Sequence, residues 1–361
     1  MTWRGQQLPP DHPPVKSGRI GVLLVNLGTP DAPDPVSVKK YLGQFLSDRR
    51  VIEIPPIAWQ PILRGVILNT RPQKSAEAYA KIWTPRGSPL AYITARQAEA
   101  MAEALGDAAG DAPGDAPGHA PGHAGPIVDY AMRYGKPSIE DKLTLLMHEG
   151  CDRILVAPMY PQYCAATTAT VFDEIARVLG EMRWQPALRF VPPYHDDEAY
   201  IAALADDLTR QVAGLDFSPE VMLLSFHGMP LRTLEQGDPY HCQCCKTSRL
   251  LQERLHGRPE FEGVRFETTF QSRFGPAKWL EPATDDTLVK EGEKGTRRLA
   301  VAAPGFAVDC VETLEELALE GRDEFLEAGG EDYAVLDCLN TSDAGLIMLE
   351  AMLRRELSGW I

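Results

Sequence analysis

Short runs of apolar residues alternate along the chain with longer segments of helical periodicity. The runs lack the polar alternation of a half-exposed strand, so they predict strands that are covered on both faces. Strands that alternate with helices indicate parallel βαβ units, and we therefore expect an α/β fold with open parallel sheets. The predicted strands are residues 19–27, 153–157, 221–226, 298–303 and 334–339, and the predicted helices are residues 75–83, 94–105, 138–149, 169–181, 198–212 and 342–357.

Two segments interrupt this alternation. Residues 106–126 form a short repeat of Ala, Pro and Gly with Asp or His, which has almost no side chains to bury and predicts a disordered surface insertion. Residues 191–195 contain two adjacent prolines and predict a lobe boundary. The length of 361 residues exceeds one ordinary domain, so we expect a first lobe over residues 17–192 and a second over residues 193–333.

The chain is acidic, with 36 Lys and Arg against 51 Asp and Glu and a net charge of −15. Nucleic-acid binding needs a basic face, so this balance argues against a nucleic acid as the partner. The N-terminal segment is polar without a signal pattern, and no apolar run is long enough to predict a membrane span. Seven cysteines, an odd number, fit a reducing compartment. We expect a cytoplasmic protein, and the sequence leaves its oligomeric state open.

A histidine follows the third predicted strand. Ligands of open parallel sheets bind at the carboxyl ends of the strands, and His227 stands at such an end with Gly228 next to it. A neutral imidazole at this place can accept a proton or ligate a metal near pH 7. The alternative is a histidine that is hydrogen-bonded within a loop, and the residues alone leave both interpretations open.

Three acids follow the fourth predicted strand. Asp309, Glu312 and Glu316 have the spacing i, i+3 and i+7, which places them on one face of an α-helix. Crowded carboxylates raise the pKa of at least one member, which suits proton relay or metal binding. The alternative is an N-cap at Asp309 with Glu312 as the acid of a capping box.

Three cysteines are clustered in the second half of the chain. Cys242 and Cys245 have CxxC spacing, with Cys244 between them. They are candidate ligands of an Fe–S cluster or zinc, but no second CxxC motif completes a site with four ligands. Reduced thiols with a structural or reactive role are the alternative.

Basic and aromatic residues are scattered through the first half of the chain. Arg71, Tyr79, Arg133 and Tyr134 could together hold a flat, acidic, aromatic ligand by stacking and carboxylate pairing. Residues 55–68 are apolar on nearly every side and predict either a buried helix or an exposed lip. An exposed lip would contact an apolar ligand or a membrane surface.

Nine segments of the chain, in order, resemble sequence motifs of the ferrochelatase family. They are residues 25–30 (VNLGTP), 45–48 (FLSD), 87–90 (GSPL), 132–134 (MRY), 160–163 (YPQY), 225–230 (SFHGMP), 237–240 (GDPY), 271–276 (QSRFGP, followed by Trp279 and Leu280) and 309–316 (DCVETLEE). The resemblance covers nearly the whole chain. Ferrochelatases are lyases that insert ferrous iron into a porphyrin in the last step of haem synthesis, so the resemblance implies this activity.

The resemblance also implies an architecture and a metal site. It implies two Rossmann-like lobes with a porphyrin cleft between them, and a C-terminal strand and helix, residues 334–361, that join the first lobe. His227 and Glu312 would form the metal-site pair, in which His227 accepts a pyrrole proton or ligates the iron. Asp309 and Glu316 would belong to an acidic line along which protons leave or iron arrives. Imidazole and carboxylate suit ferrous iron because thiolates would bind it too tightly for release.

By the same resemblance, part of the first lobe faces the porphyrin. The residues expected to do so are Leu27, Arg71, Tyr79, Arg133 and Tyr134. Residues 54–68 correspond to the hydrophobic lip of the family and imply peripheral contact with the inner membrane. Some bacterial members carry a [2Fe–2S] cluster, so Cys242, Cys244 and Cys245 remain candidates for such a cluster.

The implied substrates are ferrous iron and protoporphyrin IX, and the products are protohaem and two protons. The apolar lip favours protoporphyrin, because coproporphyrin is more polar. Coproporphyrin remains an alternative substrate. The sequence also leaves open a chelatase that loads cobalt or nickel into a different tetrapyrrole, a non-catalytic tetrapyrrole carrier, and a redox protein built on residues 241–245. A carrier would need neither an acidic helix face nor a base opposite it.

Overall fold

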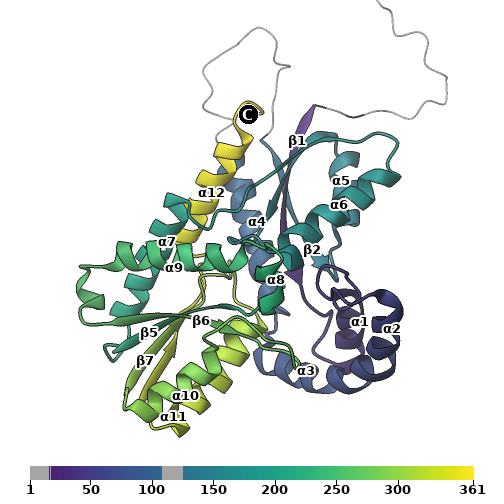
Figure 1. Cartoon of the computed structure of the whole chain (residues 1–361). Helices are drawn as coiled ribbons and strands as arrows, with labels where there is room; N and C mark the ends of the chain where they lie inside the picture. Colours follow the sequence, from purple (N-terminus) through teal and green to yellow (C-terminus); the bar gives the residue numbers. More distant parts are fainter. Residues whose placement is uncertain (1–15, 17, 108–124) are drawn as a thin grey trace, which may run out of the picture.

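The computed structural model describes residues 16, 18–107 and 125–361 and contains two four-stranded parallel sheets (Figure 1). The strand order is β2-β1-β3-β4 in the first sheet and β6-β5-β7-β8 in the second. Helices flank each sheet, so the expected α/β fold of two Rossmann-like lobes is confirmed. Most of the expected insertion, residues 108–124, lies outside the described residues.

The first lobe is the first sheet with its helices, and the second lobe is the second sheet with its helices. The elements of the first lobe are β1 (Arg19–Gly28), α1 (Pro35–Phe45), α2 (Pro56–Ile62), the π-helix η1 (Leu63–Ile67), α3 (Leu68–Ile82), α4 (Pro89–Asp107), β2 (Ile127–Tyr134), α5 (Ile139–His148), β3 (Cys151–Pro158), the π-helix η3 (Ala165–Ala169), α6 (Thr170–Glu181) and β4 (Ala187–Phe190). The elements that follow are α7 (Glu198–Ala213), β5 (Val221–His227), α8 (Leu231–Glu235), α9 (Tyr240–Leu255), the short helix η4 (Pro259–Phe261), β6 (Arg265–Gln271), α10 (Thr284–Lys294), β7 (Arg298–Ala302), the π-helix η5 (Glu312–Glu320), α11 (Gly321–Glu327), β8 (Asp332–Val335) and α12 (Asp343–Leu357).

The strands with continuous apolar runs lie at the centre of each sheet. In β1, Val22 and Leu24 point to one face and Leu23 and Val25 to the other, and all four side chains are fully buried. Hydrophobic cores therefore form on both faces of the first sheet, as the lack of polar alternation predicts. The second sheet is likewise covered on both faces, by separate apolar clusters.

The ends of β1 and β2 approach each other closely at Gly28. This glycine has a φ of +114°, and a Cβ atom there would lie 1.8 Å from the carbonyl oxygen of Tyr134. Only glycine fits such a close approach, because any side chain would overlap the neighbouring main chain. The tight junction places Gly28 opposite Tyr134 at the carboxyl edge of the first sheet, with Leu27 directly before it.

The largest apolar core is shared by the two lobes. It includes residues of β1 and β3 from the first sheet and of β5 and β7 from the second, with α4, α7 and α12 packed among them. The predicted helix at residues 342–357 is confirmed as α12, and Leu349, Met352, Leu353 and Leu357 on its apolar stripe are buried. Residues of both sheets and of these helices thus belong to one continuous apolar core.

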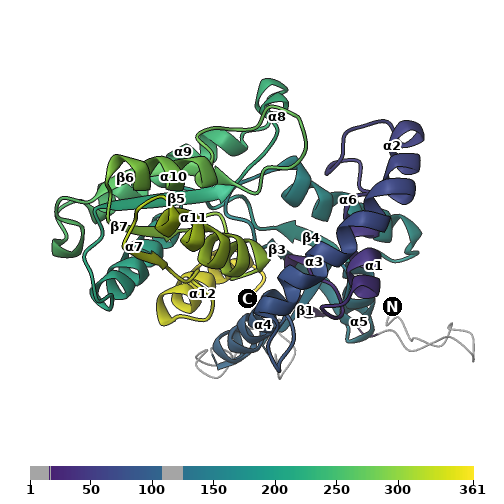
Figure 2. The same cartoon turned by 90° about the horizontal axis from the view of Figure 1, so that it is seen from below.

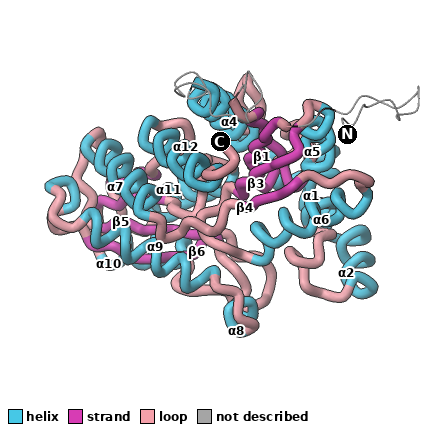
Figure 3. Tube along the Cα trace, turned by 90° about the horizontal axis from the view of Figure 1, so that it is seen from above, coloured by secondary structure: helices cyan, strands magenta, loops and turns pink. Residues whose placement is uncertain are grey.

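The C-terminal segment departs from the expectation in one respect. The strand expected at residues 334–339 was to join the first lobe, but the observed strand is β8, which pairs with β7 in the second sheet. The expectation is therefore wrong for the strand. The helix α12 does pack against α4 and β3 of the first lobe, beside α7 (Figure 3). The lobe boundary at residue 192 remains a prediction.

The end of α12 is fastened to the edge strand of the first sheet. Arg189 of β4 donates hydrogen bonds to the carbonyl oxygens of Glu356 and Ser358, at 3.0 and 2.9 Å. The same guanidinium group lies 4.2 Å from the centre of the Trp360 ring. A cation at the carboxyl end of a helix also interacts favourably with the helix dipole, so this contact stabilises the last turn.

None of the helices that the structure describes combines the length and apolar character needed to cross a membrane.

Candidate metal and porphyrin site

A third residue, Gln271, contacts the main chain next to His227 and the main chain of Glu312. His227 ends β5, and its register partner on β6 is Gln271. The side-chain amide of Gln271 donates a hydrogen bond of 2.9 Å to the carbonyl oxygen of Glu312, the first residue of η5. The main-chain N–H of Gly228 donates to the carbonyl oxygen of Gln271 at 2.7 Å. The proposed metal-site pair thus lies at the carboxyl edge of the second sheet, where open α/β sheets bind ligands.

The imidazole of His227 has a defined orientation. Its Nδ1 atom lies 2.7 Å from the carbonyl oxygen of Gly228. A carbonyl oxygen only accepts hydrogen bonds, so Nδ1 carries the proton of the neutral ring. The lone pair of the neutral ring is then on Nε2, which leaves this atom able to accept a proton or bind a metal.

The acids after β7 lie on a π-helix. Hydrogen bonds from i to i+5 widen the turn of such a helix to more than four residues, so acids four positions apart share a face. Glu312 and Glu316 have this spacing in η5, and Glu320 continues it. The carboxylate of Glu316 accepts a 2.6 Å hydrogen bond from the main-chain N–H of Ser272 and another from its hydroxyl.

Glu316 has the protonation behaviour that a relay requires. Burial, together with the nearby Glu312 carboxylate, raises the pKa of its carboxyl to about 7, whereas the hydrogen bonds from Ser272 oppose the rise. A group that titrates near neutral pH can accept and release protons under working conditions. One acid of the group thus has a raised pKa as expected, but burial raises it more than the neighbouring carboxylate does.

Asp309 does not share the helical face of the other two acids. It precedes η5, is buried, and its carboxylate accepts a 2.8 Å hydrogen bond from the hydroxyl of Thr313 and a second from the amide of Asn340. Its main-chain N–H donates to the Asn340 side chain at 2.9 Å. The expectation of one shared α-helical face is wrong for Asp309, because the helix begins only after it and is a π-helix. The alternative of an N-cap at Asp309 with Glu312 in a capping box is also wrong, because the N-cap residue of η5 is Val311 and no side-chain cap hydrogen bond is present. Asp309 instead contacts the helix through the side chain of Thr313.

Leu27, Tyr79 and Tyr134 lie in one apolar cluster of the first lobe. The cluster also contains Val311 and Leu314, which flank Glu312. Burial and then the charge of Glu312 raise the pKa of Tyr79 well above its ordinary value, and this places the phenol near the metal-site acid. The first lobe therefore presents an apolar, aromatic wall to the start of η5, as a macrocycle site requires.

Arg71 reaches from the first lobe to the second. Its guanidinium carbon lies 3.9 Å from the centre of the Phe274 ring, in the loop after β6. Burial lowers the pKa of this arginine, which reflects the loss of contact with water. The pair joins α3 to the loop that follows Gln271.

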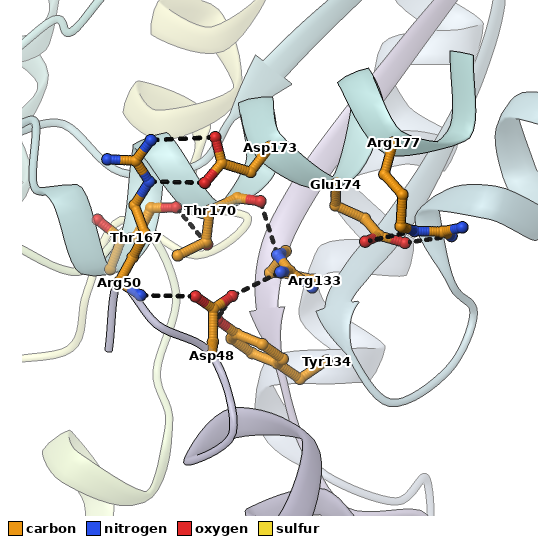
Figure 4. A network of polar contacts seen from close by, with 9 residues as sticks. All are labelled: Asp48, Arg50, Arg133, Tyr134, Thr167, Thr170, Asp173, Glu174 and Arg177. Carbon is orange, nitrogen blue, oxygen red and sulfur yellow. Dashed lines mark hydrogen bonds and ion pairs between the residues drawn. The ribbon is translucent and has the colours of Figure 1, made fainter. Parts of the chain in front are cut away.

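Arg133 and Tyr134 are engaged by an acid that the sequence did not reveal. The guanidinium of Arg133 lies 2.6 Å from the Asp48 carboxylate and also donates to the carbonyl oxygen of Thr170, while the Tyr134 hydroxyl donates to Asp48 at 2.9 Å (Figure 4). The Arg133 and Asp48 side chains are only 13% and 12% exposed. The charge of Arg133 is thus already balanced within the protein. Both residues line an open polar cavity of about 460 Å³, which also contains Arg177 of α6.

The clustered cysteines face different directions. Cys242 and Cys245 are exposed on α9, whereas Cys244 is fully buried. Cys244 thus lies on a different side of α9 from Cys242 and Cys245. Across residues 16, 18–107 and 125–361, no three His, Cys, Asp or Glu side chains form a metal-binding group.

Comparison with known proteins agrees with this geometry. The ferrochelatase family model matches residues 19–357. The chain belongs to the ferrochelatase family. It is therefore an enzyme, a lyase that inserts a metal ion into a porphyrin in haem biosynthesis, and the family uses Fe²⁺ as the metal substrate.

Individual relatives of the ferrochelatase family support the match along the whole chain. A ferrochelatase from Rhizobium etli is 53% identical over 355 residues, which cover 98% of each chain. One from Methylocella silvestris is 48% identical over 352 residues, with 97% of each chain covered. Among solved structures, SirB from Bacillus subtilis with Fe³⁺ has a TM-score of 0.52 at 13% identity, over 94% of this chain and 96% of that one. The last likeness concerns the fold alone.

The ferrochelatase lip combines a buried and an exposed side. Trp59 and Leu63 of α2 and η1 are buried, whereas Ile57, Ile62 and Val66 are 90%, 46% and 54% exposed. Both sequence interpretations of this segment are thus partly correct. Helix α2 stands at the periphery of the first lobe (Figure 2).

Sequence reasoning missed four residues of this ferrochelatase site. Gln271, Ser272 and Phe274 lie in a segment that resembles a family motif, but the motif gives them no role. Asp48 also lies in such a motif, yet its partner Arg133 is 85 positions away in sequence. An acid next to a predicted loop is the only signal that could have indicated Asp48.

Proposed function

We propose that this ferrochelatase inserts Fe²⁺ into protoporphyrin IX, giving protohaem and two protons, as the terminal step of haem biosynthesis. The observation that carries the proposal is the placement of His227 and Glu312 on either side of Gln271, beside an apolar wall. Insertion exchanges two pyrrole N–H protons for one divalent cation, so a base, a weak metal ligand and a proton exit are needed. These three requirements match the residues present.

Each residue then has a defined role. The free Nε2 atom of His227 either accepts a pyrrole proton or, with the Glu312 carboxylate, binds the incoming iron, because its one lone pair serves one purpose at a time. Glu316, with a pKa of about 7, takes protons onward along the face of η5. Asp309 acts indirectly, because its carboxylate is occupied by Thr313 and Asn340 and holds the start of the helix.

The macrocycle would lie against the first lobe. Leu27, Tyr79 and Tyr134 supply the apolar wall, and Arg71 is placed to meet a propionate at the edge. Arg133 supports the wall through Asp48 and does not itself receive a ligand carboxylate. An apolar wall that presses on one side of the ring would favour a bent macrocycle, which exposes the nitrogen lone pairs.

Anaerobic metallation tests the proposal. Purified protein is mixed with Fe²⁺ and protoporphyrin IX, and the change from the absorption bands of the free porphyrin to those of the metalloporphyrin reports insertion. Replacing His227 with Ala should lower turnover by about 100-fold or more, because a positioned base contributes at least this much. His241→Ala is the matched control, since His241 is a histidine of α9 that the proposal does not use. Near-normal turnover of the His227 variant would contradict its assigned role.

The same assay separates the possible substrates. The ratio of kcat/KM for protoporphyrin and coproporphyrin identifies the porphyrin, and competition with Co²⁺ and Ni²⁺ identifies the metal. A non-catalytic carrier would quench porphyrin fluorescence by binding but would yield no metalloporphyrin. Wild-type protein that binds porphyrin without metallating it would overturn the enzymatic proposal.

We further propose that the lip contacts the cytoplasmic face of the inner membrane. Ile57 at 90% exposure, with Ile62 and Val66, forms an apolar surface that water solvates poorly. Flotation with phospholipid vesicles tests this. Ile57→Glu should reduce the bound fraction, and Ile347→Glu, at an exposed site on α12, is the control. Equal flotation of both variants and wild type would contradict the proposal.

For the cysteines we propose reduced thiols without a cluster. Cys244 is buried on the opposite side of α9 from its exposed neighbours. The visible spectrum of the purified protein should therefore lack absorption from a [2Fe–2S] cluster. Bands that disappear in a Cys242→Ser variant would contradict this.

A further inference from the structure

Gln271 is a buried amide whose polar groups are all engaged at the metal site. Its side chain lies at the end of β6 and is only 2% exposed. Its Oε1 atom accepts a hydrogen bond of 2.8 Å from the Ser225 hydroxyl, and its Nε2 atom donates to the Glu312 carbonyl oxygen. Its own carbonyl oxygen accepts the N–H of Gly228. One residue therefore bonds the main chain next to His227 and the main chain of Glu312.

The orientation of this amide is determined by its partners. A main-chain carbonyl only accepts, so the NH₂ group must face Glu312 and the oxygen must face Ser225. The Ser225 hydroxyl lies 2.8 Å from that of Thr284, which donates to the Thr269 hydroxyl at 2.9 Å. This buried chain of hydroxyl groups fixes Ser225 and, through it, the amide of Gln271.

We propose that Gln271 is a positioning residue that sets the separation of His227 and Glu312. The inference rests on the roles proposed above for these two residues. A displacement of about 1 Å at a reacting group costs about 100-fold in rate, so a bond that fixes both segments has a direct effect on catalysis.

The residue after Gln271 extends the same contact to the second acid. Ser272 has a φ of +64°, a conformation that residues other than glycine rarely adopt. In this conformation its N–H and hydroxyl both reach the Glu316 carboxylate. The adjacent residues Gln271 and Ser272 thus contact Glu312 and Glu316 of η5, which supports a positioning role for the end of β6.

The test replaces Gln271 by Met, which has a similar size but neither donor nor acceptor. The full-length variant should lose about 10- to 100-fold in kcat/KM for Fe²⁺, mainly through KM, while the dissociation constant for porphyrin stays that of wild type. Binding of Co²⁺ to the porphyrin-free protein, followed by its visible absorption, should weaken in parallel. Gln271→Glu, which keeps an acceptor for Ser225 but places an oxygen against Glu312, should be impaired to a similar degree.

A matched control separates positioning from stability. Thr287 of α10 is also buried, and its hydroxyl donates a 2.7 Å hydrogen bond to the Ala283 carbonyl oxygen outside the site. Thr287→Val should lower Tm without changing KM for Fe²⁺. If Gln271→Met lowers Tm as Thr287→Val does and leaves kcat/KM for Fe²⁺ unchanged, Gln271 is only structural and the proposal is wrong.

Two further outcomes keep the test decisive. If Gln271→Met does not fold, Ser225→Ala takes its place, because it frees the amide while its NH₂ group remains. A rise in KM for Fe²⁺ supports the proposal, and an unchanged value overturns it. If wild-type protein does not metallate porphyrin, or His227→Ala remains active, the proposed function fails, and that result is independent of Gln271.

Discussion

Replacing Glu316 with Gln should stabilise the folded protein at neutral and alkaline pH and have little such effect in acid. Burial raises the pKa of Glu316 from an ordinary 4.5 to about 7 in the folded protein. Between these values the unfolded chain has lost the proton while the folded chain retains it. The stability that this group contributes is therefore present in acid and is lost as the pH rises through about 7. An amide has no charge to bury at any pH and escapes this loss.

The magnitude follows from the interval between the two pKa values. One pKa unit corresponds to about 1.4 kcal/mol, so the interval from 4.5 to about 7 corresponds to about 3 kcal/mol in the free energy of unfolding. Within this interval the wild-type protein should lose at most about 1.4 kcal/mol per pH unit through Glu316. The difference between variant and wild type isolates this contribution from other titrating groups.

Urea unfolding followed by tryptophan fluorescence from pH 5 to pH 8.5, with a chelator present, measures the difference. The free energy of unfolding of Glu316→Gln, minus that of wild type, should grow by about 3 kcal/mol with rising pH. Ser272→Ala removes a hydrogen bond that lowers the Glu316 pKa, so this pKa should be higher in the variant. The free energy of unfolding of Ser272→Ala should therefore keep falling up to a higher pH than that of wild type. A difference between Glu316→Gln and wild type that stays constant with pH would refute the reasoning.

Two other substitutions address the surroundings of the site. Asp309→Ala removes the acceptor that anchors η5 through Asn340 and should cost about 3 kcal/mol in the free energy of unfolding, measured by urea titration. Turnover of Asp309→Ala should also fall, and Asn340→Ala should likewise lower both stability and turnover. Wild-type stability of both variants would contradict the anchoring role. Arg133→Ala leaves the Asp48 carboxylate buried without its partner and should cost about 3–5 kcal/mol. Adding Asp48→Ala should recover part of this loss in a double-mutant cycle, and purely additive losses would exclude the coupling.

The strands that the sequence predicts well are the central ones. Residues 19–27, 153–157, 221–226 and 298–303 correspond to β1, β3, β5 and β7, which occupy the two middle positions of each sheet. The strands at the edges were missed or displaced, because a strand with one free side is only half buried and interrupts its apolar run with polar residues. Strand β2, with its Asp129 and Arg133, is an example.

The sequence yields candidate site residues where the chemistry lies in the side chain itself. His227 and Glu316 follow apolar strands and carry groups that titrate or bind metals, so position and type indicate them. Gln271 acts through its contacts, and an amide at the end of a strand carries no signal before the fold is known. The spacing of the acids was interpreted with an α-helical period, so Asp309 was placed on the wrong face.

The position of α12 constrains the order in which the protein can be completed during synthesis. Arg354 of this helix donates a hydrogen bond to the carbonyl oxygen of Ala104, across 250 positions of sequence. Helix α4 and strand β3 leave the ribosome long before the helix that covers them, so the first lobe carries an open apolar face while the second lobe is translated. Contacts of such long range also slow folding, because a large loop must close before they form. The first lobe to be synthesised is thus the last to be finished, and until then its incomplete core is exposed to aggregation and to chaperones.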